Sequence, residues 1–333
     1  MKDRDIPLSL LDLVPIGQGF TPQDALKNST RLAQAAEQSG FLRYWVAEHH
    51  NLIDIASAAT SVVLSHIGAN TSTIRLGSGG IMLPNHAPLM VAEQFGTLES
   101  FYPGRIDLGL GRAPGTDMAT LRALRRDLTG NGLDFPEMLT ELQGYLAPLQ
   151  RQQRIKAIPG AGLAIPLWLL GSSTYSAQLA AARGLPLAFA AHFAPDAMSA
   201  AIATYRDHFK PSAQLSEPYV IVCVNAVAAE TQREAEYLAT TELQKFLNLG
   251  RGIDTLLPEP VEEMDRLWHP MEARQIRHQL RESAWGTGPQ VSQQLRELAV
   301  RTGADEVMIN SWIHDPEARI DSHQRIAAAW FDA

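Results

Sequence analysis

Short apolar or β-branched runs alternate with helical patterns along most of this chain. The runs have the length and residue types of β-strands, and segments with helical start signals separate them. Eight candidate strands cover residues 8–14, 44–47, 74–81, 105–110, 166–170, 187–190, 219–227 and 306–311. This pattern predicts a strand–helix alternation over nearly the whole length.

The connecting segments begin and end with helix signals. Thr21 and Pro22 supply a cap and a first-turn proline for one helix, and Gly40 ends it. Pro136 and the pair Pro195-Asp196 open two others. Because each parallel neighbour in a sheet needs a crossover, the alternation predicts a parallel sheet.

Eight strand–helix units in 333 residues favour a single (β/α)₈ barrel domain over residues 1–333, with an open doubly wound sheet as the alternative. Two connections are long for a barrel, at residues 115–133 and 249–285. The second comes before the last βα unit. It fits a lid or binding loop and a tolerated surface insertion equally well.

Composition excludes several classes of protein. Hydrophobic residues make up 45% and charged residues 19% of the chain, which is typical of a globular protein with a full core. A net charge of −8, without a basic block, argues against nucleic-acid binding. Cys223 is the only cysteine, so neither an internal disulfide nor a four-cysteine zinc site can form. The chain shows no signal peptide and no membrane-spanning run, so we expect a cytoplasmic location without membrane association.

Ala47-Glu48-His49-His50 ends the second candidate strand. In a barrel, residues at the carboxyl ends of strands face the active site. Neighbours on extended backbone point opposite ways, so at most two of Glu48, His49 and His50 converge there. Histidine exchanges protons near neutral pH, although a structural hydrogen-bonding role is favoured for His50. The other histidines are dispersed and no H-E-x-x-H spacing occurs, so no metal site is expected.

Two glycine-rich strand ends follow. Gly79-Gly80 fits either a site where a flat ligand lies on the backbone or a sharp strand exit. The segment from Gly109 through Gly111 and Arg112 to Gly115 is not a dinucleotide fingerprint, because it lacks the G-x-G-x-x-G spacing. An arginine at a strand mouth is well suited to bind a phosphate, and Arg122 is a second candidate. A solvated helix face is favoured for Arg125 and Arg126.

A run of hydroxyl residues follows the fifth candidate strand. Ser172, Ser173, Thr174 and Ser176 surround Tyr175 where an alanine-rich helix begins. Backbone N–H groups, hydroxyls and the helix dipole at such a start can bind a phosphate. An ordinary serine N-cap needs only one of these hydroxyls. With Arg112, this segment suggests one phosphate held from two neighbouring strand ends.

In the order of these motifs the chain resembles the bacterial luciferase-like flavin monooxygenase family. The resemblance spans nearly the whole chain and rests on residues 47–50, 76–84, 105–112, 115–118 with Arg122, 286–289 and 303–306.

The resemblance implies a (β/α)₈ barrel that binds FMN reduced by a separate NAD(P)H-dependent reductase. Oxygen then gives a peroxyflavin that oxidises a small organic substrate. His49 matches the catalytic histidine, with Glu48 beside it. Gly79-Gly80 falls where the family often has a non-prolyl cis peptide under the flavin. Matches to flavin or phosphate contacts fall at Arg112, Arg122, Ser172 and Tyr175, to which we add Ser173.

The chain also departs from the light-emitting members. Gly111 stands where the luciferase catalytic subunit has a cysteine near the flavin, so light emission and an aldehyde substrate do not carry over. A homodimer is typical of the family. Three other functions stay open: a deazaflavin-dependent hydride-transfer oxidoreductase, a non-catalytic flavin-binding protein and an aldolase-like lyase. The last is disfavoured because no candidate strand end carries a lysine.

Overall fold

A closed barrel of parallel strands forms the centre of the protein. The structure is a computed structural model that describes residues 6–112, 118–124 and 134–332. Within these residues eight strands close the barrel in the order β10-β1-β2-β3-β5-β6-β7-β8, and β8 pairs with β10. They are β1 (Leu8–Asp12), β2 (Arg43–Val46), β3 (Arg75–Ser78), β5 (Ile106–Gly111), β6 (Leu167–Gly171), β7 (Leu187–Ala190), β8 (Val220–Ala229) and β10 (Glu306–Asn310).

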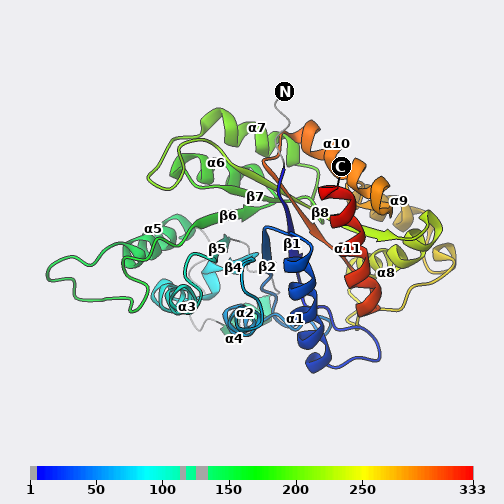
Figure 1. Cartoon of the computed structure of the whole chain (residues 1–333), viewed down its shortest axis with the longest axis horizontal. Coiled ribbons are helices and arrows are strands. Elements are labelled where there is room, and N and C mark those ends of the chain that lie inside the picture. The colour runs from blue at the N-terminus through cyan, green and yellow to red at the C-terminus, as the bar shows by residue number, and fades with distance from the viewer. Residues whose placement is uncertain (1–5, 113–117, 125–133, 333) are drawn as a thin grey trace.

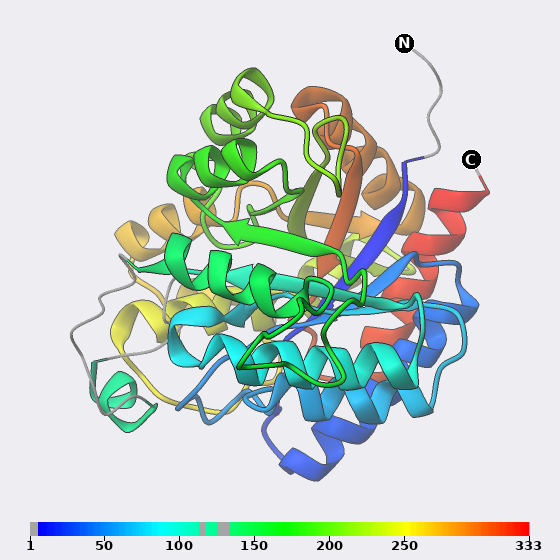
Figure 2. The ribbon, with the colours of Figure 1, turned by 90° about the vertical axis from the view of Figure 1, so that its left-hand side faces the viewer.

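Helices cover the outside of the barrel, as Figures 1 and 2 show from two directions. They are α1 (Pro22–Gln38), α2 (Thr60–Ala69), α3 (Pro88–Phe101), α4 (Met118–Leu124), α5 (Phe135–Leu146), α6 (Thr174–Arg183), α7 (Met198–His208), α8 (Gln232–Arg251), α10 (Gly288–Thr302) and α11 (Pro316–Phe331). The predicted (β/α)₈ barrel is therefore confirmed, and the open sheet is excluded.

The sequence signals place most element ends correctly. Thr21 caps α1 through a capping box with Asp24, and Gly40 has φ +85° just beyond the helix end. Helix α5 begins beside Pro136, whereas α7 begins at Met198, after the predicted start at Pro195.

The predicted strand 74–81 is interrupted. β3 ends at Ser78, and a short strand β4 (Ile81–Met82) follows and pairs with β5. The 3₁₀ helix η1 (Leu83–Asn85) then leads into α3.

The long segment 249–285 carries structure of its own. It contains the 3₁₀ helix η2 (Met264–Arg266), helix α9 (Pro270–Gln279) and the first part of strand β9 (Ala284–Thr287). β9 pairs with the carboxyl-terminal half of β8, outside the closed barrel. The sequence pattern did not predict this strand. In the described part of the chain, no helix is both long and apolar enough to cross a membrane.

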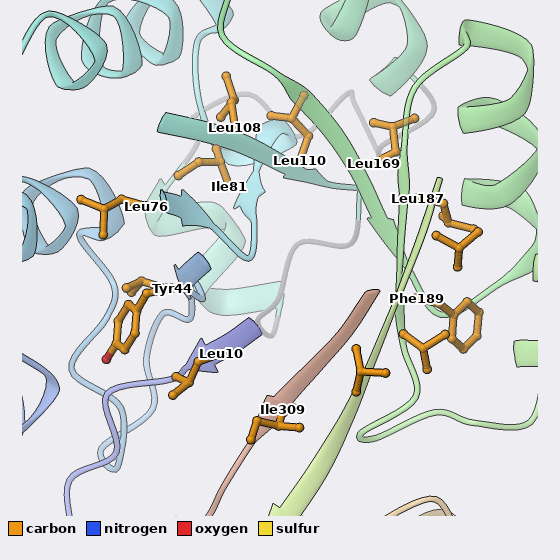
Figure 3. Packing of buried hydrophobic residues seen from close by; sticks show 14 of the residues in the cluster. Leu10, Tyr44, Leu76, Ile81, Leu108, Leu110, Leu169, Leu187, Phe189 and Ile309 are labelled. Atoms are coloured by element: carbon orange, nitrogen blue, oxygen red, sulfur yellow. The ribbon is translucent and has the colours of Figure 1, made fainter. Parts of the chain in front are cut away.

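Apolar packing occurs on both faces of the strands. Outward side chains such as Leu10, Leu76 and Phe189 are fully buried and pack in one large cluster between the strands and the helices (Figure 3). Inward side chains such as Trp45, Trp168 and Met308 form a second cluster in the lumen. The barrel strands are thus largely buried on both faces, as expected for a parallel barrel.

A buried ionic cluster fills the amino-terminal end of the lumen. Arg43 donates from Nη1 to Asp107 and from Nε to Glu306, each at 2.8 Å, and Tyr219 donates to Glu306 at 2.8 Å. The guanidinium carbon of Arg43 also lies 4.6 Å from the ring centre of Trp168. These contacts occupy the amino-terminal end of the lumen with side chains that pair with one another.

Candidate functional site

The side chains that follow β2 have different partners. Ala47 packs in the lumen cluster, and His49, two residues on, interacts electrostatically with His192, which follows β7. Glu48 and His50 contact each other, with Glu48 Oε1 2.8 Å from His50 Nε2. His49 thus interacts with a residue that follows β7, whereas Glu48 and His50 contact each other.

Glu48 is a buried carboxylate with several partners. Its side chain is 1% exposed, and its Oε1 lies 2.9 Å from His86 Nε2. The Met82 backbone N–H donates to Oε2 at 3.1 Å. Burial alone would raise the pKa of Glu48, but His86, His50 and the Met82 N–H together hold it below its ordinary value. The side chain is therefore ionised at neutral pH.

Glu48, His50 and His86 are also a possible set of metal ligands. Their donor atoms lie within 4.8 Å of one another, and two imidazoles with one carboxylate suit zinc and related ions. The sequence interpretation missed this cluster because it treated His86 as one of several dispersed histidines.

His192 is a second imidazole near His49 that the sequence did not indicate. Burial, with a smaller contribution from the nearby His49, lowers the pKa of His192 to about 4, although a hydrogen bond with the Cys223 backbone opposes the shift. Its Nδ1 is buried and has no hydrogen-bond partner among the described residues. His192 is therefore neutral at pH 7.

A buried polar network supports the segment that carries His192. Asn225 on β8 donates from Nδ2 to the His192 carbonyl at 2.7 Å and to Glu242 Oε1 at 2.6 Å. Ser283 and Trp285 also donate to Glu242, at 2.8 and 3.2 Å. Burial raises the pKa of Glu242 to about 7 against the effect of these hydrogen bonds.

Two of the residues predicted to bind a phosphate, Arg112 and Tyr175, contact each other. Arg112 directly follows β5, and its guanidinium carbon lies 4.1 Å from the ring centre of Tyr175 in the first turn of α6. Ser173 is the N-cap of α6, and its side chain makes no capping hydrogen bond within the described residues. Ser172 and Ser173 are half-buried. The start of α6 thus presents N–H groups and hydroxyls beside a fixed cation.

Other predicted contacts are less defined. Arg122 is exposed on α4. Gly115, Arg125 and Arg126 lie outside the described residues. The role of Arg122 therefore stays a prediction.

The peptide bond between Gly79 and Gly80 is cis, as the resemblance implied. A Cβ on Gly80 would lie 2.8 Å from the Gly109 carbonyl oxygen, and one on Gly79 would lie 2.5 Å from Leu11. Gly111, the last residue of β5, would meet Met82 at 2.7 Å. At Gly80 the neighbouring atoms belong to the backbone, so a side chain there would force the backbone to move, whereas at Gly79 and Gly111 they are the ends of side chains that can shift.

A (β/α)₈ barrel with histidines, a cation and hydroxyl groups at the carboxyl ends of its strands defines an enzyme-like barrel with its site at that face. The profile of the luciferase-like monooxygenase family matches residues 8–306. A luciferase-like monooxygenase of Escherichia coli K12 is 50% identical over 324 residues, 97% of each chain. The protein belongs to this family, and it is a monooxygenase-family enzyme.

A more distant relative has a named substrate class. The N-acetyl-S-alkylcysteine monooxygenase of Bacillus subtilis is 34% identical over 261 residues, which are 75% of this chain and 76% of the relative.

Solved structures share the fold. The crystal structure of apo-MsnO8 has a TM-score of 0.88 at 34% identity and covers 98% of both chains. The FMN complex of a type II Baeyer–Villiger monooxygenase has a TM-score of 0.71 at 16% identity, covering 97% of this chain and 96% of that one. An F420-dependent secondary alcohol dehydrogenase has a TM-score of 0.64 at 16% identity, covering 97% and 98%. The last two show likeness of fold alone.

Proposed function

We propose that this protein is the oxygenase of a two-component, FMN-dependent monooxygenase. It would use reduced FMN and O₂ to oxidise a small organic substrate, and a separate NAD(P)H-dependent reductase would supply the reduced flavin. The observation that carries this proposal is the stacking of Arg112 on Tyr175 at the start of α6.

The residues at this start fit the phosphate of FMN. Arg112 supplies a positive charge, and Tyr175 holds its guanidinium in place. The first turn of α6 supplies N–H groups, with Ser172 and Ser173 beside them. This compact arrangement favours FMN over a deazaflavin, because the longer charged tail of a deazaflavin would need further basic groups along the rim.

His49 is proposed as the acid–base residue. It follows β2 at the carboxyl end of the barrel, beside the lumen, and imidazole exchanges protons near neutral pH. His192 is neutral at pH 7, so it would interact with ligands as a hydrogen-bonding group without a charge. Bound reduced FMN would supply the electrons that activate O₂, and the glycines 79, 80 and 111 would line its ring.

A homodimer is part of the proposal. Val62 on α2 is 68% exposed, and Met90 and Phe101 on α3 are 56% and 64% exposed. Such apolar side chains on two neighbouring helices favour a self-contact through α2 and α3. Sedimentation equilibrium tests this, and a monomer at micromolar concentration would contradict it.

The function can be tested by reconstitution. The protein, a flavin reductase, NADH and FMN would be incubated under ¹⁸O₂ with a panel of small organic compounds, beginning with S-alkyl N-acetylcysteines because of the B. subtilis relative. Incorporation of ¹⁸O into a product, dependent on FMN, would support the proposal. Hydride transfer from reduced F420 without oxygen incorporation would instead support the deazaflavin alternative.

A further inference from the structure

The Glu48 carboxylate contacts two imidazoles and one backbone N–H. These groups come from three places in the chain: His50 two residues after it, Met82 in β4 and His86 just before α3. His86 Nε2 lies almost midway between the two carboxylate oxygens, 2.9 Å from Oε1 and 3.0 Å from Oε2. Distances of 2.8–3.1 Å are those of direct N–H···O hydrogen bonds.

The charge state of the carboxylate determines which partners donate. An ionised carboxylate has only acceptor sites, so each nitrogen at hydrogen-bond distance must carry a hydrogen. His50 and His86 both contact Glu48 through Nε2. When neutral, both rings must therefore carry their proton on Nε2 and a lone pair on Nδ1.

The same contacts join two parts of the proposed active site. Glu48 stands next to His49 in the segment after β2, whereas Met82 lies two residues beyond the Gly79–Gly80 peptide. One buried carboxylate therefore fixes the position of the His49 segment relative to β4. Loss of the Met82 or His86 donor would remove a contact that holds the two segments together.

We propose that Glu48 is a positioning residue that fixes His50 and His86 as their Nε2–H tautomers and ties the His49 segment to β4. In this arrangement His86 acts through its donation to Glu48 and does not itself transfer protons to substrate. The kinetic part of the test below rests on the proposed function, whereas the spectroscopic part does not.

The spectroscopic test is long-range ¹H–¹⁵N NMR of protein labelled with ¹⁵N-histidine, with the two rings assigned through His50→Gln and His86→Gln. We expect both rings to show a protonated Nε2 and an unprotonated Nδ1. Glu48→Gln should change this pattern, because glutamine replaces one acceptor oxygen with an NH₂ group, which cannot accept from His86 Nε2 or from the Met82 N–H. An Nδ1–H form of either ring in the native protein would overturn the proposal. So would stoichiometric bound metal whose removal by EDTA changes the two signals, because Nε2 would then be a ligand.

The kinetic test compares two replacements of His86. A glutamine side chain can place an N–H near the position of Nε2, whereas an asparagine side chain is too short and reproduces Nδ1. We expect His86→Asn and Glu48→Gln to lower product formed per reduced flavin by about 100-fold, the usual scale for misplaced reacting groups. His86→Gln should keep most of the native product formed per reduced flavin, and its Kd for FMN should be unchanged.

The positioning role would be overturned if His86→Gln were as inactive as His86→Asn while circular dichroism showed both variants to be folded. If native protein binds FMN but forms no product, the proposed function fails, and the NMR result still decides the tautomers.

Discussion

Replacing Arg112 with alanine should weaken FMN binding while leaving riboflavin binding almost unchanged. The two flavins share the ring and ribityl chain and differ in the phosphate, so the difference isolates the phosphate contact. Arg112 is half-buried, and its guanidinium carbon lies 4.1 Å from the Tyr175 ring centre, next to the start of α6. The cation is thus held before a ligand arrives.

The magnitude follows from one charge-assisted contact. Hydrogen bonds to charged groups contribute about 1.5–3 kcal/mol. Because 1.4 kcal/mol corresponds to a factor of ten, the FMN Kd should rise by about 10-fold to 150-fold. The riboflavin Kd should change by less than about 3-fold, since a neutral chain end gains nothing from the cation.

The assay is calorimetric or fluorescence titration of each flavin, repeated at higher salt. Arg151→Ala is a matched control, because Arg151 is exposed in the connection before β6, at the opposite end of the barrel. It should leave both Kd values unchanged. An equal loss of affinity for FMN and riboflavin in Arg112→Ala would refute a phosphate contact and indicate a distorted ring site.

Three further results are expected. His49→Ala should abolish product formation while FMN binding survives, and unchanged turnover would remove His49 from the chemistry. Gly109→Ala should destabilise the fold by about 1–3 kcal/mol, because its Cβ would lie 2.0 Å from the Ser78 carbonyl oxygen. Thermal melts test this, with Gly144→Ala as the control because no atom lies within 4 Å of a Cβ at that position. Glu242→Gln should change how stability depends on pH. The native carboxyl has a pKa of about 7 against 4.5 in the unfolded chain, so its contribution falls by about 3 kcal/mol as pH rises through that interval. Identical pH dependence of native protein and variant in denaturant melts would contradict the assignment.

The sequence predicted the barrel well because the strands of a parallel barrel are buried on both faces. Their apolar runs are continuous, and the helix between each pair carries its own start and stop signals, as at Thr21 and Gly40. β9 escaped prediction because it pairs only with the outer end of β8 and its short sequence, AWGT, lacks an apolar run.

The site was predicted in part for a related reason. The proximity of Arg112 and Tyr175 could be predicted, because they follow the neighbouring strands β5 and β6 and the ends of parallel strands lie at one face of the barrel. The partners of Glu48 could not, because His86 lies 38 residues away in a connection whose path the sequence does not specify. The contact of Glu242 could not be predicted either, because Glu242 lies on the outer helix α8 and accepts a hydrogen bond from Asn225 on β8.

The most direct test of FMN-dependent function is anaerobic titration of the purified protein with reduced FMN and, separately, with reduced F420. We expect saturable binding of reduced FMN that is much tighter than binding of reduced F420 and that is weakened by Arg112→Ala. Tight binding of F420 with weak binding of FMN would contradict it and would make the protein a hydride-transfer enzyme on the same barrel.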